Sequence, residues 1–560
     1  MTDPLKRIAE MVENATVIWD GDAPANDPAA PVQRLAPIAR DDRGAAHVQA
    51  WRTLTMCRNL VQNDTDNGRR LILWFGENFR FVRDIGWAVW SGSHWEMTGG
   101  AEALKRYAQA TARMIAHEAL LIRPTPAERD AIEGGTDAER DKALGEVEKR
   151  RSARRKFAIS SGNSARIASM IDTAAPHITI GVEQLDADAM LYNVENGTLR
   201  FSREIDPDCP DPDIVRFTGK VNLQPHARTD LQAKLAPVPY DPAAPCTRWL
   251  AFLARFQPKE DRRRFLQVYH GYAILGLMGA QKLVFNYGEG ANGKSTFIEA
   301  ICRQMGNYAR TLNSESLTGT QQRGSGQATP DLAQLPGARM VRVSELPRGE
   351  PLKETLVKSL TGGEPMMVRH NFGNFFEFRP NFKPSMSGND KPRIDGVDHG
   401  IWRRVCLVVW GVTIADDERR DMEEVLAEFW EERSGVLNWL IEGALIYLRE
   451  GLQVPKDILD ATAEYRADMD HIQGFIDSCI TRTEIETCTV NARALYLAYE
   501  VWCIANAIKP WSEKAFAVTM QKKGFKKVEA RVRYYTYIAL HDVPDDPRHH
   551  QPRSPYGETP

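Results

Sequence analysis

The stretch VFNYGEGANGKSTF, at residues 284–297, contains GEGANGKS, which matches the pattern G-x-x-x-x-G-K-[ST]. A short apolar run, KLVFNY at residues 282–287, leads into the pattern, and the helical sequence FIEAICRQM follows it. Glycines allow such a loop to curl so that its backbone N–H groups point inward at the start of a helix, where anions are favoured. The stretch therefore predicts a strand, a phosphate-binding loop and a helix, which restricts this region to an α/β fold.

Two side chains of the loop carry the predicted chemistry. Lys294 is expected to reach the β and γ phosphates of a nucleoside triphosphate, and Ser295 is expected to ligate Mg²⁺. The loop therefore predicts a nucleoside triphosphate and Mg²⁺ as cofactors. The predicted nucleotide-binding residues are Gly288, Glu289, Gly290, Ala291, Asn292, Gly293, Lys294, Ser295 and Thr296.

Two further polar side chains follow predicted strands downstream of the loop. Residues 340–343 are apolar and lead to Glu345, whose carboxylate would polarise the attacking water and help Ser295 to hold Mg²⁺. Asn389 follows another short strand, where an amide can orient water beside the γ-phosphate. Pro384 weakens the prediction of that strand, because proline has no N–H to donate. Glu345 and Asn389 are predicted catalytic residues.

Arg403 and Arg404 precede a third apolar strand, at residues 405–410. An arginine in this place can project across a subunit boundary to a neighbour's phosphate and act as an arginine finger. Both arginines are therefore predicted to be catalytic. A homo-oligomer is implied as well, because the finger of one copy completes the site of another.

Composition bounds the remaining possibilities. A chain of 560 residues with 26% charged residues is expected to be a soluble protein of several domains. No apolar run approaches the ~20 residues of a membrane-spanning helix, and the N-terminus lacks a signal-peptide pattern, so a cytoplasmic location and no membrane partner are expected. The net charge of -3 excludes a global basic field, so any nucleic acid must be bound by local basic surfaces. The cysteines form no C-x-x-C pair, which argues against a zinc ribbon.

The composition along the chain predicts the domain organisation. Residues 190–201 (MLYNVENGTLRF) are expected to form a hairpin that turns at Asn196 and Gly197, and residues 149–156 form a basic run on an exposed helix. The predicted segments are a mobile arm at 1–45, a mixed α/β accessory domain at 46–240, a nucleotide-binding core at 241–415, a helical extension at 416–480, a winged-helix-like domain at 481–541 and a disordered tail at 542–560.

The motifs GEGANGKST, VRVSE, VKSLTGGEPMMVRH and GNDKPRIDGVDHGIWRR, in this order, resemble those of superfamily 3 helicases. More narrowly, the chain is similar to phage and plasmid primase-helicases and to the poxvirus primase-helicase. Two motifs around Trp87 and Asn196 resemble the domain that precedes the helicase in that family, so the resemblance covers about residues 65 to 540. It implies an AAA+ P-loop core between the accessory domain and a C-terminal winged helix.

The resemblance also assigns roles to individual residues. It makes Glu345 the Walker B acid and Asn389 sensor 1, and it favours Arg404 over Arg403 as the finger. Walker B carries a serine and a glutamate here, so only one carboxylate can be assigned. The family also has a motif between Walker B and sensor 1 that leads into a pore-facing β-hairpin. The residues of this region predicted to contact DNA are Lys358, Arg369, His370, Asn371 and Phe372, and the alternative is a hairpin that packs within its own subunit.

A second predicted DNA contact lies in the winged-helix candidate. Positive charge beside tyrosines there suits phosphate contact with base stacking, although many winged helices bind proteins instead. The predicted residues are Lys522, Lys523, Lys526, Lys527 and Arg531.

Together these features predict an ATP-dependent replicative DNA helicase of a phage or other mobile element. It would act on single-stranded and forked DNA as a homo-oligomeric ring, expected to be a hexamer, and the resemblance implies movement from 3′ to 5′. A separate primase or polymerase is an expected partner, because residues 1–65 are too few and too loop-like for a priming domain. Two alternatives remain open: an ATP-switched initiator or helicase loader, and a primase-helicase with a cryptic priming site.

Overall fold

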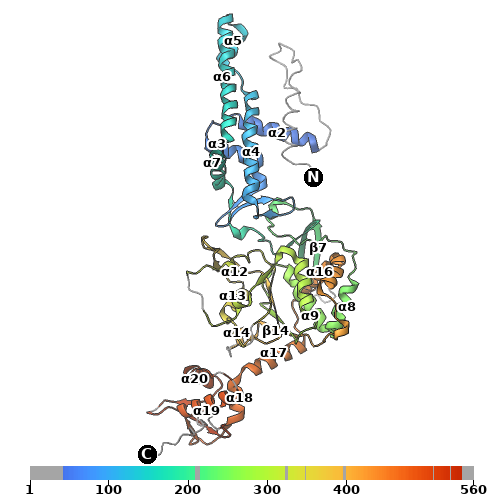
Figure 1. Cartoon of the computed structure of the whole chain (residues 1–560), viewed down its shortest axis with the longest axis vertical. Helices are drawn as coiled ribbons and strands as arrows, with labels where there is room; N and C mark the ends of the chain where they lie inside the picture. Colours follow the sequence, from blue (N-terminus) through green and yellow to red (C-terminus); the bar gives the residue numbers. More distant parts are fainter. Residues whose placement is uncertain are drawn as a thin grey trace, which may run out of the picture. The chain divides into compact units, whose positions relative to one another are not determined.

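A computed structural model of the chain describes residues 42–207, 215–321, 326–346, 349–394, 399–506, 508, 510–529 and 531–544. These residues form a mixed α/β structure with a parallel sheet (Figure 1). They divide into two compact units. The first unit comprises Met1–Arg200, Asn222–Ala236 and Met367–Phe378, and the second comprises Phe201–Val221, Pro237–Met366 and Arg379–Pro560.

The first unit combines helices with a small mixed sheet. Its sheet has the order β3-β2-β1-β4, in which β4 pairs parallel to β1 and the other pairs are antiparallel. The strands are β1 (Phe79–Val82), β2 (Gly86–Trp90), β3 (Trp95–Glu96) and β4 (Thr179–Ile180). The helices are α2 (Asp42–Cys57), α3 (Asp64–Phe75), α4 (Gly100–Glu118), α5 (Pro126–Gly134), α6 (Asp137–Ser161) and α7 (Ser164–Ala174).

The core of this unit forms where one face of the sheet meets the helices. Phe79 and Val89 of the sheet pack with Leu71 of α3, Leu104 of α4 and Met170 of α7. Alternation in β1 and β2 places these apolar side chains on the same face, as expected for a sheet with one covered side.

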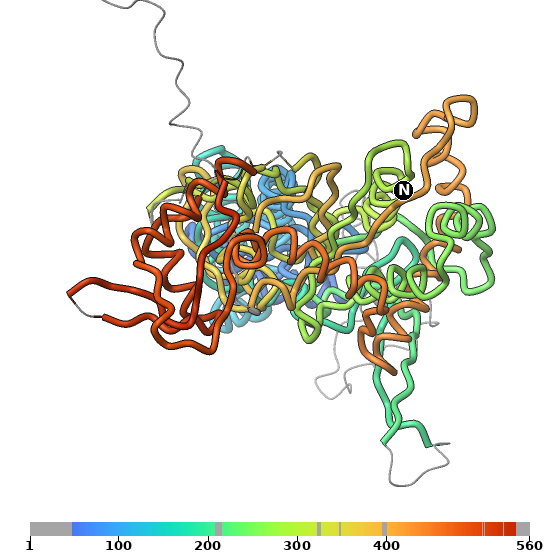
Figure 2. Tube along the Cα trace, turned by 90° about the horizontal axis from the view of Figure 1, so that it is seen from below, coloured from blue at the N-terminus to red at the C-terminus, as the bar shows by residue number. Residues whose placement is uncertain are grey.

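A hairpin of β5 (Leu191–Val194) and β6 (Gly197–Ile205) follows, and β7 (Phe217–Gln224) pairs beside β6, so that the two strands run as a ribbon (Figure 2). Val194 pairs with Gly197, so the two turn residues are Glu195 and Asn196. The predicted turn is therefore displaced by one residue. Gly197 begins the strand with a φ of 158°, which is extended backbone rather than a turn conformation.

Two arginines of the basic run at residues 149–156 pair with carboxylates of the first unit, whereas Lys149, Arg155 and Lys156 of the run are exposed. Arg154 and Arg70 both pair with the buried carboxylate of Glu118, and Arg150 pairs with Glu128 at 2.5 Å. A buried carboxylate requires such partners, because an unpaired charge is costly away from water. These arginines are therefore structural.

The predicted chain ends fall mostly beyond the described residues. Residues 1–41 of the predicted arm and 545–560 of the predicted tail lie outside the described part of the chain. The end of the arm needs correction, because helix α2 already begins at Asp42. Among the described residues, no helix combines the length and the apolar content needed to cross a bilayer.

A five-stranded parallel sheet organises the second unit. Its order is β14-β8-β13-β10-β9, with strands β8 (Leu283–Tyr287), β9 (Ala309–Leu312), β10 (Met340–Val343), β13 (Lys383–Gly388) and β14 (Val405–Val409). Strands β8 and β14 are apolar and largely buried, and β13 is fully buried although its sequence, KPSMSG, is mostly polar, as fits a sheet whose two faces helices cover. The nearby helices are α8 (Thr247–Phe256), α9 (Glu260–Ile274), α10 (Lys294–Met305), α11 (Ser314–Leu317), α12 (Pro330–Ala333), α13 (Glu354–Gly362) and α14 (His399–Trp402).

Strand β13 contains Pro384 and is nevertheless a central strand. Its pairing with β8 begins only at Ser385, and Lys383 donates its N–H toward the β10 side, to Arg339. Alternate residues of a parallel strand bond to opposite neighbours, so the missing N–H of Pro384 faces β8 before that pairing starts. The proline therefore leaves no gap in the sheet.

Helices complete the second unit. They are α15 (Met422–Glu431), α16 (Arg433–Glu450) and α17 (Lys456–Met469), and α16 packs along α9. The last part contains α18 (His471–Cys479), α19 (Ala492–Ala505) and α20 (Glu513–Lys522). Its strands are β15 (Ile480–Arg482), β16 (Thr489–Asn491), β17 (Lys527–Val528), β18 (Tyr534–Thr536) and β19 (Ile538–Leu540). Phe475, Tyr499 and Phe516 form the centre of its own core.

Candidate nucleotide site

The carboxyl ends of three neighbouring strands bring the predicted site residues to one edge of the parallel sheet. Lys294 follows β8, Asn389 follows β13 and Glu345 follows β10, and these strands lie side by side in that order. The Lys294 Nζ donates to the Gly288 carbonyl at 3.0 Å and to Asn389 Oδ1 at 2.6 Å. Open parallel sheets bind ligands at this edge, where the direction of the connections changes.

The loop between β8 and α10 depends on backbone conformations that glycine allows. Gly290 has a φ of 108° and Gly293 a φ of 77°, and Gly293 is the residue from which α10 starts. At Gly288 a Cβ would lie 2.6 Å from the Trp410 carbonyl oxygen, so no side chain fits there. Ala291 also has a positive φ, of 45°, which is unusual for a residue with a side chain. The loop is thus strained and closely packed.

Lys294 is buried although it carries an ammonium group, with 6% of its surface exposed. Burial lowers the pKa of Lys294 from its ordinary value, because desolvation disfavours the charged form. Two oxygen acceptors hold the ammonium in place of a phosphate.

Glu345 is exposed and has a φ of 59°. A left-handed conformation is strained for glutamate and is often found at functional sites. The preceding Ser344 accepts a 3.4 Å hydrogen bond from the Ser387 hydroxyl of β13. This bond ties the end of β10 to the strand that leads to Asn389.

The donor set suits a nucleotide with a divalent cation. The first turn of α10 presents backbone N–H groups and the exposed hydroxyl of Ser295, and Lys294 adds a positive charge. Within the described ranges, no group of three or more His, Cys, Asp or Glu side chains forms a metal cage.

The two candidate finger arginines lie at the opposite edge of the sheet. The Arg404 carbonyl accepts from the N–H of Leu283 at the start of β8, 2.8 Å away. Strand β14 then extends about 16 Å to the carboxyl edge. Neither arginine lies beside the loop of its own chain.

Arg403 and Arg404 differ in their surroundings. Arg404 is 9% exposed, and its guanidinium donates to Thr361 Oγ1 at 3.1 Å and to the Gly400 carbonyl at 2.6 Å. Arg403 is exposed and donates to Gln281 Oε1 at 2.8 Å. The sequence favours Arg404 as the finger, whereas the burial pattern favours Arg403, because only an exposed guanidinium can reach another subunit without unpacking its own.

The predicted hairpin forms from β11 (Met366–Val368) and β12 (Phe376–Phe378). Phe372 at its tip is fully exposed and has a φ of 60°. The Arg369 guanidinium lies 4.8 Å from the centre of the Phe375 ring, and the His370 ring lies 5.7 Å from that of Phe376. Asn371 is exposed beside Phe372. The tip thus presents an aromatic ring to solvent, and the basic side chains of Arg369 and His370 lie on the adjoining segment.

Asn374 of this hairpin donates to Asp84 of the β1–β2 turn at 3.1 Å, and β12 packs against the residues Val182–Gln184. Val368, Phe376 and Phe378 are buried, so the strands of the hairpin belong to the core of the first unit. Lys358 of α13 does not lie on the hairpin. Its amine lies 3.7 Å from the Glu354 carboxylate, one helical turn away.

The predicted basic residues near the C-terminal end fall into two groups. Lys522, Lys526 and Arg531 are exposed. Lys523 instead donates to Asp470 and Gln473 at 2.7 and 2.8 Å, and so helps to hold the start of α18. Lys527 is half-buried, with its amine 4.0 Å from Glu529. The amine of Lys523 is thus engaged within its own domain, unlike the exposed side chains of Lys522, Lys526 and Arg531.

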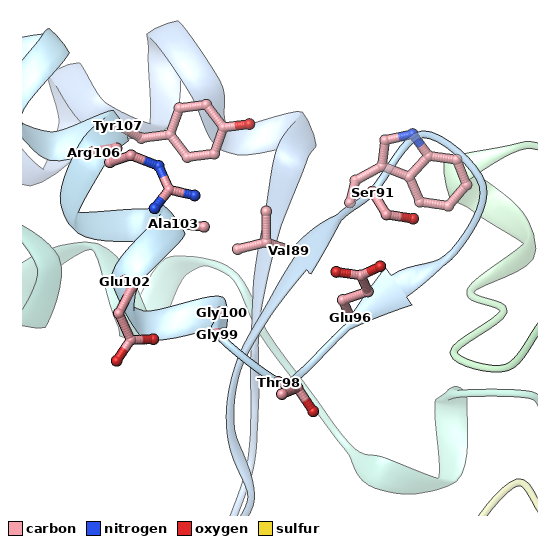
Figure 3. Close-up of a pocket in the computed structure, with 11 residues that line it drawn as sticks. Val89, Ser91, Glu96, Thr98, Gly99, Gly100, Glu102, Ala103, Arg106 and Tyr107 are labelled. Atoms are coloured by element: carbon pink, nitrogen blue, oxygen red, sulfur yellow. The ribbon is translucent and has the colours of Figure 1, made fainter. Parts of the chain in front are cut away.

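The first unit also contains a pocket of about 490 Å³ between α4 and the edge of the small sheet. In Figure 3, Arg106 and Tyr107 of α4 lie across this pocket from Ser91 and Glu96. Glu102 adds a second carboxylate to its rim. None of the predicted site residues lines it, and two carboxylates beside one arginine do not favour a phosphate.

Two side chains beside the loop were not singled out by the sequence, Asn286 and Trp410. Asn286 is a buried amide inside an apolar strand, and a polar residue within such a run is the signal that could have identified it. Trp410 reads only as the last apolar residue of a strand, so its role becomes visible only in three dimensions.

Comparison with known families finds two matches. A family described as "D5 N terminal like" matches residues 68–258, and a family of unknown function, DUF5906, matches residues 286–404. The second range includes the loop, Glu345, Asn389 and both arginines.

Similar proteins come from large DNA viruses. "Putative helicase L207/L206" of Acanthamoeba polyphaga mimivirus is 25% identical over 341 residues, which cover 58% of this chain and 34% of that protein. "Putative helicase 022R" of Frog virus 3 is 26% identical, with 48% and 29% covered, and "Primase D5" of Fowlpox virus is 31% identical, with 29% and 21% covered. The matching part of this chain thus spans between 21% and 34% of each of these relatives.

Solved structures are more distant. A structure titled "The A form apo structure of NrS-1 C terminal region-CTR" aligns with 54% of this chain and 78% of its own, at 12% identity and a TM-score of 0.35.

Proposed function

This chain belongs to the D5-like primase-helicase family of superfamily 3 helicases. On that basis we propose that it is an ATP-dependent DNA helicase that unwinds DNA during the replication of a phage or other mobile element. One observation carries the proposal: Lys294, Asn389 and Glu345 stand at the carboxyl ends of three adjacent parallel strands. A phosphate loop, a carboxylate and an amide in this arrangement can bind a triphosphate and direct a water at it.

Each residue of the site has a separate proposed role in ATP hydrolysis. The loop N–H groups and Lys294 bind the phosphates, while Ser295 and Glu345 are the residues that would hold Mg²⁺, which neutralises phosphate charge when bound. Glu345 accepts the proton of the attacking water, and Asn389 orients that water. Lys294 donates to Asn389 at 2.6 Å in this structure. A bound γ-phosphate competes for that ammonium and so frees the amide for the water.

We assign the second unit's sheet to an AAA+ P-loop core that works as a ring, expected to be a hexamer. The support is geometric, because Arg403 and Arg404 lie at the far edge of the sheet from their own loop. They can serve a nucleotide only in trans, as an arginine finger does. On exposure Arg403 is the better candidate.

The hairpin with Phe372 at its tip is the proposed grip on one DNA strand, and movement from 3′ to 5′ is the direction expected for the family. An aromatic ring can stack on a base, and Arg369 can contact phosphate. The region of α18–α20 with its strands is the proposed winged helix. Lys522, Lys526 and Arg531 are its exposed candidates for duplex contact.

A forked DNA duplex with ATP and labelled deoxynucleotides tests the proposal against both alternatives. A helicase separates the strands, and Lys294→Ala abolishes hydrolysis and unwinding together. An initiator or loader binds the fork and hydrolyses ATP slowly but leaves the duplex intact. Primer synthesis on a single-stranded template would favour a primase-helicase, an activity that the name of the Fowlpox virus relative suggests.

A further inference from the structure

Trp410 is a buried residue that connects the parallel sheet to the phosphate loop. It directly follows β14, and 1% of its surface is exposed. Its backbone N–H donates to the Tyr287 carbonyl at 2.7 Å, and its indole N–H donates to Asn286 Oδ1 at 2.9 Å. The indole also packs against Phe297 of α10, with ring centres 5.3 Å apart. Main chain and side chain are thus both held by the strand or helix that flanks the loop.

Asn286 fixes the orientation of the indole. This residue of β8 is fully buried, and its amide Nδ2 donates to Ser385 Oγ and to the Met386 carbonyl, each at 3.2 Å. Because the Nδ2 group is used toward β13, the Oδ1 atom is left to accept from Trp410. With these partners the Asn286 amide can take only one orientation, and this orientation fixes the direction of the Trp410 indole N–H.

The carbonyl of Trp410 lies inside the curl of the loop. It accepts from the Asn292 Nδ2 atom at 3.1 Å, and Asn292 is only 3% exposed. A Cβ at Gly288 would lie 2.6 Å from the same oxygen. Further along, the Ile414 N–H donates to the Ala291 carbonyl at 2.7 Å. The segment after β14 therefore contacts the loop at its beginning and at its middle.

We propose that Trp410, oriented by Asn286 and bonded to Asn292, is a positioning residue that holds the phosphate loop in its nucleotide-binding shape. This inference rests on the proposed function, because it concerns the same site. The Asn292 side chain is turned to Trp410, which leaves its backbone N–H for phosphate. The sequence assigns Asn292 to nucleotide contact, and this geometry gives its side chain a supporting role instead.

The alternative is that these contacts serve only the stability of the core. The two cases differ in what they predict for ATP binding. A positioning role predicts that the KM for ATP rises more than kcat falls, because the loop visits binding-incompetent shapes once its support is removed. A role in stability alone predicts a lower melting temperature and an unchanged KM in the folded protein.

The experiment uses the full chain with three single substitutions. Asn292→Ala removes the hydrogen bond to the Trp410 carbonyl, and Trp410→Phe keeps an aromatic ring beside Phe297 while removing the indole N–H. Asn438→Ala is the matched control. The amide of Asn438 donates to the carbonyls of Asp241 and Ala244 at 2.8 and 3.1 Å, away from the loop.

A fluorescent ATP analogue reports the dissociation constant, steady-state hydrolysis reports KM and kcat, and thermal unfolding reports stability. The loss of one buried hydrogen bond predicts that Asn292→Ala weakens nucleotide binding about tenfold, and Trp410→Phe acts in the same direction. The control keeps the wild-type affinity. Wild-type affinity in both test variants would overturn the positioning role, whereas a wild-type protein that binds no nucleotide would overturn the proposed function itself.

Discussion

Replacing Arg403 and Arg404 by alanine, one at a time, separates two neighbouring residues that the structure places in opposite surroundings. Arg404 loses two hydrogen bonds from a buried guanidinium, to Thr361 at 3.1 Å and to Gly400 at 2.6 Å. Bonds to charged groups contribute about 1.5–3 kcal/mol each, so Arg404→Ala should lower the free energy of unfolding by about 3–6 kcal/mol. Arg403 is exposed, and its replacement should change that free energy by less than about 0.5 kcal/mol.

The two variants should rank in the opposite order for ATP hydrolysis, with Arg403→Ala losing more activity than Arg404→Ala. A finger arginine contributes a factor of about 10³ or more to kcat, so Arg403→Ala should bind ATP normally and hydrolyse it about a thousandfold more slowly. Urea unfolding, ATP affinity and phosphate release measure the three quantities on the same protein samples. Loss of hydrolysis in a stable, ATP-binding Arg404→Ala protein, with full activity in Arg403→Ala, would refute the argument from burial.

Mixing two inactive variants tests whether the contact acts in trans. Lys294→Ala subunits lack the loop lysine but carry Arg403, and Arg403→Ala subunits have the converse defect. In a random equal mixture about a quarter of head-to-tail interfaces combine an intact Lys294 with an intact Arg403. The mixture should therefore recover about a quarter of wild-type hydrolysis, and no recovery would exclude the trans assignment.

Three further outcomes follow from the structure. Asn193→Ala should destabilise the first unit by about 3 kcal/mol, measured by urea unfolding, because its buried amide donates to Ser93 and Lys234 at 2.9 and 3.1 Å. Burial lowers the pKa of His270 to about 4, so between that pH and about 6.5 the unfolded state binds a proton that the folded state does not. Stability should therefore fall as the pH drops through this range, by about 1 kcal/mol per pH unit more than in His270→Leu, and parallel pH profiles would contradict this. Replacing Arg369 and His370 of the hairpin segment by alanine should leave basal ATP hydrolysis intact and abolish unwinding. An unchanged unwinding rate would exclude the hairpin as the element that holds the DNA strand.

The strands around the site could be predicted closely because they are short apolar runs that are buried on both faces. The run at 282–287 becomes β8 at Leu283–Tyr287, and β10 falls at the predicted residues, Met340–Val343. Each strand is followed by a polar residue, so a parallel sheet brings Lys294, Glu345 and Asn389 to one edge. Local pattern and sheet geometry together were sufficient for this part.

The features that could not be predicted depend on partners that are distant in sequence. Arg403 and Arg404 are consecutive, and which of them is buried is decided by Thr361 of α13. Lys523 reads as one of several surface lysines, yet Asp470 lies beside it in the folded chain. A charge pattern shows how many basic residues a segment carries, but not which of them already have a carboxylate as partner.

The course of the chain between the two compact units has a consequence for how this protein can be dissected. The chain passes from one unit to the other five times, after residues 200, 221, 236, 366 and 378. No single cut therefore separates the units. A fragment that starts near residue 240 would keep the hairpin of Met367–Phe378 and lose the surface on which Val368, Phe376 and Phe378 are buried. Weak DNA binding by such a fragment would therefore reflect the exposure of these three buried side chains and not the loss of a DNA contact. Point substitutions at the hairpin tip leave the packing of the hairpin strands intact.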